Sequence, residues 1–101
     1  MNVTPIRPAS PSAEDRIQRL ALTFPSLRGL VEKKWNPESL DEWAGSIASS
    51  GERLSVQFVL AVWNPYHEWK CGKFDVIDAS STWDEEHWNA FRAWADRPFT
   101  L

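Results

Sequence analysis

His87 and Asp84 are the residues of this sequence best suited to acid–base chemistry. They stand three positions apart in a segment of helical periodicity, so the carboxylate could orient the imidazole as a general base. Hydrolysis would also need a nucleophile, and the spacing ties none of the candidates Ser80, Ser81 and Cys71 to the pair. A core histidine bonded to a carboxylate or a backbone carbonyl explains the same pattern, and we therefore expect no enzyme.

Metal ligands are too few for a structural site. His67-x-x-x-Cys71 offers two ligands, whereas structural zinc needs four, and only His87 and carboxylates remain to complete the set. The acidic triplet 84–86 could hold Mg²⁺, but carboxylates in the first turn of a helix are already explained by the helix dipole. The sequence predicts neither a metal nor another cofactor.

Two short runs mix lysines with aromatic residues, as single-strand binding patches do: Lys33-Lys34-Trp35, and Tyr66-His67-Glu68-Trp69-Lys70 with Lys73 nearby. The chain as a whole carries a formal charge of −3, which argues against a nucleic-acid binder. Direct contact with nucleic acid is therefore a lesser possibility.

The segment 64–73 reads as a loop, because Asn64-Pro65 opens it and Gly72 closes it. Tyr66 and Trp69 cannot both be buried easily in such a segment. Exposed aromatic side chains on a loop are typical of protein contacts, which makes this loop the leading candidate surface. The alternative is that Trp69 folds back as a lid on the core.

Apolar spacing and caps predict the elements that position these residues. Helices are expected over about 13–24, 26–33 and 37–48, and a short one after Asp75. Residues 54–63 fit a helix buried on nearly all sides, although alternation in 54–62 and a competing strand over 73–78 leave an α+β fold open. Thr82 is expected to cap a last helix that ends at Arg97-Pro98 and carries an apolar arc that includes His87 and Trp88.

Composition sets the class of protein. With 101 residues, 43% of them hydrophobic, the chain can bury a core without disulfides. We expect the protein in the cytoplasm for three reasons. Its single cysteine calls for no oxidising compartment, residues 1–11 contain no apolar stretch of signal-peptide type, and no segment has the length of a membrane span. We expect a flexible tail over 1–11 and one all-α domain over 12–101, a compact bundle of about five to six helices.

The end of the chain resembles a loose group of small uncharacterised bacterial proteins encoded on phages, plasmids and integrated elements. The resemblance rests on a W-D-x-x-H-x-x-A-F-x-x-W-A stretch, here Trp83 to Ala95, followed by Pro98-Phe99. It covers about the last 50 residues and implies a helical accessory-genome protein, with no activity or cofactor. Trp88 departs from the pattern, where a polar or basic residue is expected, and this departure marks it as a candidate contact.

The sequence thus predicts a non-enzymatic module that binds another protein. A sharper version is an inhibitor of a host defence nuclease complex, of the anti-CRISPR kind. Two different functions stay open: a small hydrolase or nuclease using His87 and Asp84, and a single-stranded nucleic-acid binder. Exposed aromatic residues could equally serve a homodimer. The predicted contact residues are Tyr66, His67, Trp69, Lys70, Asp84, Glu85 and Trp88.

Overall fold

The computed structural model describes residues 12–101, so the predicted tail over 1–11 lies outside the described residues. The described part contains six α-helices and one 3₁₀ turn, η1: α1 (Ala13–Leu22), η1 (Pro25–Leu27), α2 (Arg28–Val31), α3 (Pro37–Ser46), α4 (Ser50–Trp63), α5 (Val76–Thr82) and α6 (Glu85–Asp96). It contains no strand, which confirms the all-α prediction and rules out the α+β fold.

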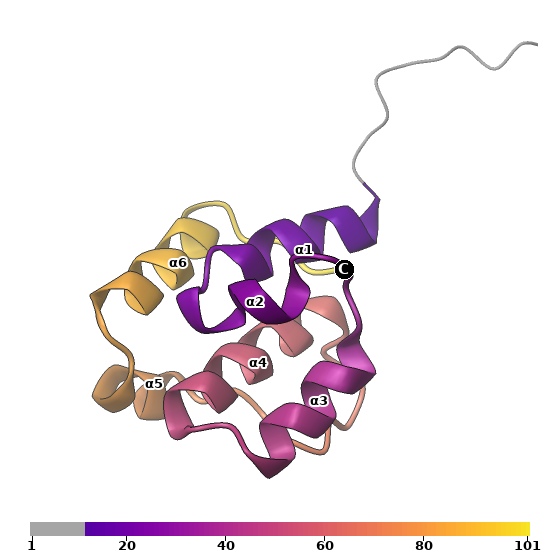
Figure 1. Cartoon of the computed structure of the whole chain (residues 1–101). Helices are drawn as coiled ribbons and strands as arrows, with labels where there is room; N and C mark the ends of the chain where they lie inside the picture. Colours follow the sequence, from indigo (N-terminus) through magenta and orange to yellow (C-terminus); the bar gives the residue numbers. More distant parts are fainter. Residues whose placement is uncertain (1–11) are drawn as a thin grey trace, which may run out of the picture.

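Helix α4 lies in the middle of the bundle (Figure 1), in contact with α1, α3, α5 and η1. Its start is a reciprocal capping box: the Ser49 hydroxyl accepts from the Glu52 backbone N–H, and the Glu52 carboxylate accepts from the Ser49 N–H. Such a cap stabilises a helix by about 1 kcal/mol. Seven residues of α4 are buried, because apolar side chains occur on nearly every side of the helix. A two-faced strand would have exposed half of them.

Aromatic rings fill the space between α4 and α6. The Phe58 ring contacts those of Phe91 and Trp94, with centroids 5.2 Å and 5.0 Å away. Trp83, just before α6, is 7% exposed and donates its indole N–H to the Gly51 carbonyl at 3.2 Å. Ala90 is the one buried residue of α6 itself, so large side chains rather than close helix packing hold this helix in place.

Several helix ends differ from the predicted ones. Thr82 does not cap the last helix: it ends α5, and the Asp84 carboxylate caps α6 by accepting from the His87 N–H at 3.0 Å. The first helix ends two residues early, because the N–H groups of Thr23 and Phe24 bond to carbonyls three residues back and tighten the last turn. The predicted helix over 26–33 is a 3₁₀ turn followed by the single turn of α2.

Length and apolar character together exclude a membrane-spanning helix among the helices described. The longest, α4, has 14 residues.

Candidate functional site

The loop between α4 and α5 is fixed at its start by Asn64. Its side-chain oxygen accepts from the Tyr66 backbone N–H at 3.1 Å. Its backbone carbonyl accepts from the His67 N–H at 3.4 Å and from the Trp69 indole N–H at 3.2 Å. The chain therefore leaves α4 in a defined turn rather than as a free loop.

The far half of the same loop is held by Asp41 of α3, which is only 6% exposed. One carboxylate oxygen accepts from the Lys70 N–H at 3.0 Å and the other from the Cys71 N–H at 2.8 Å. Burial alone would raise the pKa of Asp41, but the hydrogen bonds from Cys71 and Lys70 outweigh it and lower the pKa below its ordinary value. Asp41 was not among the predicted residues, because nothing local connects it to a loop 29 positions away.

Cys71 is poorly suited to be the nucleophile of a hydrolase. Its burial, together with the hydrogen bond and the negative charge of Asp41, raises the pKa of the thiol to about 12. The reactive thiolate is therefore scarce at neutral pH.

Four of the predicted contact residues lie on this fixed loop. Tyr66 is 94% exposed. His67 is exposed and lies against the half-buried Trp69, with ring centroids 4.2 Å apart. Lys70 is exposed, while its backbone N–H is bound to Asp41. Trp69 thus partly covers the core, as the alternative prediction had it, and Tyr66 is the aromatic ring that remains exposed to solvent.

Two cavities border the loop. One of about 280 Å³ lies beside His67 and Trp69, on the side of α4 and Phe74. The other, of about 380 Å³, lies between Tyr66 and the C-terminal residues Thr100 and Leu101. Tyr66 therefore stands at the rim of a hollow rather than on a flat face.

The remaining predicted contact residues lie elsewhere. Asp84 and Glu85 are exposed at the start of α6, and Trp88 is half-buried, with its ring edge-on to those of Trp83 and Phe91. In Figure 1 the loop leaves α4 on the right, whereas α6 begins at the left edge of the molecule. The two groups of residues do not form one surface.

His87 joins a hydrogen-bonded chain that runs from α6 to η1. Its Nδ1 lies 2.7 Å from the Asp84 carboxylate, and its Nε2 lies 3.0 Å from the Ser26 hydroxyl. The Ser26 hydroxyl donates to that of Ser55 at 3.3 Å, and the Ser55 hydroxyl donates to the Gly51 carbonyl at 3.1 Å. The His87 side chain is 12% exposed, so the ring is mostly covered.

Asp84, His87 and Ser26 follow one another in the order of the relay in serine hydrolases. The pKa of the Asp84 carboxyl is lowered, because it accepts hydrogen bonds from the backbone N–H of His87 and from the His87 ring. The carboxylate therefore stays ionised, and it favours the ring tautomer that carries its proton on Nδ1. Nε2 is then an acceptor, and the Ser26 hydroxyl would have to turn its one proton from Ser55 to the ring to donate to it. Ser80 and Ser81, the hydroxyls considered from the sequence, donate to carbonyls of their own helix. Ser26 is 61 residues from His87, and no sequence pattern links them.

The other lysine-aromatic run does not present a stacking surface. Trp35 is 4% exposed and packs edge-on against Trp63, with centroids 5.5 Å apart. Bases therefore cannot stack on this ring in the folded protein.

Neither the grouping of possible metal ligands in the described residues nor the comparisons with known proteins identify a site. Among residues 12–101, no three His, Cys, Asp or Glu side chains are grouped to hold a metal ion. No family model, curated protein or solved structure matches the chain, and the resemblance of residues 83–99 to mobile-element proteins stays a prediction.

Proposed function

We propose that the protein is a non-enzymatic binding module that docks on another protein through the loop 64–73, with Tyr66 as the central contact. The observation that carries the proposal is the pairing of a ring that is 94% exposed with a loop held at both ends by Asn64 and Asp41. A side chain on a fixed backbone loses little conformational entropy on binding. Tyrosine is also among the residues that dominate interface energies.

The hollow beside Tyr66 supports the same proposal. Trp63, Pro65 and Leu101 line it, so a partner side chain inserted there would bury apolar surface next to the tyrosine ring. The resemblance of residues 83–99 adds the expectation that the module belongs to a phage or another mobile element.

A comparison of purifications from the native host tests the proposal. A partner should be retained by the native chain and by Tyr66→Phe, which keeps the ring, but lost by Tyr66→Ala. Glu86→Ala, exposed on α6, is the control for an unrelated surface change. Equal retention by Tyr66→Ala and the native chain would contradict the proposal. Sedimentation of the purified chain separates a homodimer from a foreign partner.

The sharper version, an inhibitor of a host defence nuclease complex, rests on the other group of residues. The side chains of Asp84 and Glu85 are 67% and 78% exposed, and carboxylates can block a surface that binds phosphates. In a pull-down against host nuclease complexes, Glu85→Gln should then lose the complex, whereas Tyr66→Ala should retain it. Failure to retain any such complex would count against this version.

A serine hydrolase is a second candidate function, favoured by the relay Asp84–His87–Ser26. The Ser26 Oγ would add to an ester carbonyl while its proton passes to His87 Nε2. The ester C–O bond would then break as the leaving oxygen takes that proton. Water, activated by the same imidazole, would hydrolyse the acyl-serine and restore the hydroxyl.

Covalent labelling with a fluorophosphonate tests this candidate. Modification of Ser26 in the native protein, lost in a folded His87→Ala variant, would support it. Absence of labelling, or a His87→Ala variant that only loses stability, would assign the relay a structural role. The labelling experiment is independent of the purification with Tyr66→Ala, so the two proposals can fail separately.

A further inference from the structure

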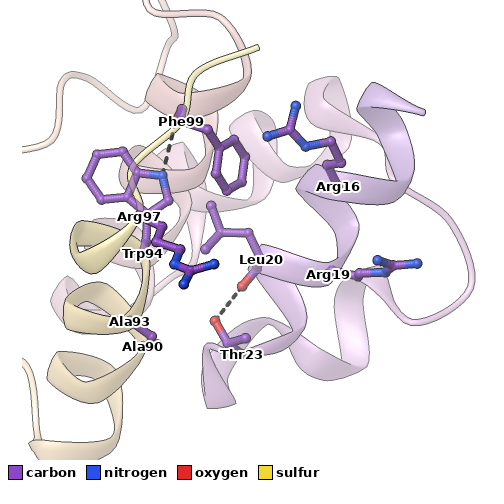
Figure 2. Close-up of a pocket in the computed structure, with 9 residues that line it drawn as sticks. All are labelled: Arg16, Arg19, Leu20, Thr23, Ala90, Ala93, Trp94, Arg97 and Phe99. Atoms are coloured by element: carbon purple, nitrogen blue, oxygen red, sulfur yellow. Dashed lines mark hydrogen bonds between the residues drawn. The ribbon is translucent and has the colours of Figure 1, made fainter. Parts of the chain in front are cut away.

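A separate cleft lies between α1 and α6 and has a volume of about 330 Å³. Figure 2 shows its apolar floor: the Phe99 ring and the Leu20 side chain lie next to each other between the two helices, and the Trp94 ring lies at the end of α6. Ala90 and Ala93, both small, leave the space open along α6. Trp94 and Phe99 are half-buried and Ala93 is exposed, so part of this apolar surface stays open, whereas Leu20 is only 8% exposed.

The floor is held in place by the backbone after α6. The Trp94 indole N–H donates to the Phe99 carbonyl at 3.1 Å, and the Arg97 N–H donates to the Trp94 carbonyl at 3.1 Å. The Leu101 N–H donates to the Val62 carbonyl at 3.0 Å, which ties this segment to α4. The cleft is thus formed before any ligand arrives, as binding sites for small molecules usually are.

The charged residues that line the cleft are all basic: Arg16, Arg19 and Arg97. The ion pairs within residues 12–101 involve His87 and Arg92, so none of these three guanidinium groups has a described carboxylate within 4.0 Å. In Figure 2 the Arg97 side chain reaches into the space between the helices. The Arg16 guanidinium lies over one face of the Phe99 ring, 4.4 Å from its centroid. In a chain of net charge −3, this cleft gathers three arginine side chains that make no described ion pair.

We propose that the cleft binds a small amphipathic carboxylate, meaning an acid with an aromatic or medium-length aliphatic group. The apolar part lies on Leu20, Trp94 and Phe99, and the carboxylate pairs with Arg97 and Arg16. Guanidinium groups match the planar carboxylate and form charge-assisted hydrogen bonds with it. A phosphate or another purely polar anion would leave the apolar floor unused.

The volume of the cleft limits the size of the acid that it can bind. Pockets for small molecules are about 300–1,000 Å³, so this cleft is at the lower limit and suits a compact acid rather than a nucleotide-sized cofactor. The site is independent of the Tyr66 loop, because the cleft and the hollow beside Tyr66 share no lining residue.

Titration of the ¹⁵N-labelled protein with octanoate tests the proposal. The backbone amide signals of Arg16, Leu20 and Arg97 and the indole N–H signal of Trp94 should shift saturably. Octylammonium, which has the same chain and the opposite charge, should not reproduce these shifts, and neither should inorganic phosphate.

Arginine variants supply the second arm. Arg97→Gln should weaken octanoate binding about tenfold, the effect of losing one charge-assisted hydrogen bond. Arg92→Gln is the matched control, since Arg92 is exposed on α6, pairs with Glu85 and does not line the cleft. Absence of shifts up to the solubility limit of octanoate, equal shifts with octylammonium or phosphate, or unchanged affinity in Arg97→Gln would each overturn the proposal.

Discussion

Replacement of Asp41 by asparagine should loosen the loop that carries Tyr66 and destabilise the whole protein. Both carboxylate oxygens of Asp41 accept backbone N–H groups, at 3.0 Å and 2.8 Å, inside the protein. Asparagine keeps one acceptor and turns an NH₂ group toward the other N–H. A lost hydrogen bond to a charged group is worth about 1.5–3 kcal/mol, and relief from burying a charge offsets part of it. We expect a net loss of about 1–2 kcal/mol in the free energy of unfolding.

Urea denaturation followed by tryptophan fluorescence measures this loss. For a chain of this size, about 1–2 kcal/mol corresponds to a decrease of about 5–15 °C in the melting temperature. Glu42→Gln is the control: it makes the same change of charge at the next position of α3, on an exposed side chain. A loss no greater than that of Glu42→Gln would refute the reasoning.

The dependence on pH provides a separate check. Because the pKa of Asp41 is lower in the folded protein than in the unfolded chain, its contribution to stability is complete above the unfolded value of about 4. It disappears as the pH falls through the folded value. The difference between native protein and Asp41→Asn should therefore shrink below about pH 4. A difference that stays constant from about pH 7 to about pH 3 would show that the carboxylate charge is not the cause.

Three further predictions concern single positions. The thiol of Cys71 is buried and its pKa is raised to about 12, so it should not react with a disulfide reagent at about pH 8 in the folded protein. It should react fully in guanidinium, and rapid labelling of the folded protein would contradict this prediction. The Trp35 indole N–H is buried with no hydrogen-bond partner among residues 12–101, whereas that of Trp83 bonds to a backbone carbonyl. Trp35→Phe should therefore lower the free energy of unfolding by about 1 kcal/mol less than Trp83→Phe, as measured by urea denaturation, and equal losses would contradict the assignment. Gly72 has a φ of 93°, so Gly72→Ala should lower the melting temperature by the equivalent of about 1–2 kcal/mol, while an unchanged melting temperature would mean that the loop adopts another conformation.

Local signals predicted most of the helices, because a cap acts within a few residues. Ser12, Asn36 and Asp75 each accept a backbone N–H from the first turn of the helix that follows them. The prediction that Thr82 caps the last helix was wrong, because Asp84 is an equally good cap residue. The cap position depends on where the preceding helix ends, and α5 includes Thr82.

The sites depend on contacts that no local pattern encodes. Asp41 meets its loop across 29 and 30 positions, and Ser26 meets His87 across 61. The cleft arginines come from helices at opposite ends of the described chain. The exposure of Tyr66 could be predicted because Asn-Pro opens a loop, whereas the hydrogen bonds that hold this loop still could not.

The attachment of α6 by rings has a consequence for motion. Seven residues of α4 are buried and one of α6 is, so the backbone amides of α6 should exchange with solvent through a partial opening that leaves α4 closed. Such an opening would separate His87 from Ser26 and remove one wall of the α1–α6 cleft at the same time. Ligand occupancy of that cleft and slow amide exchange in α6 should therefore rise together.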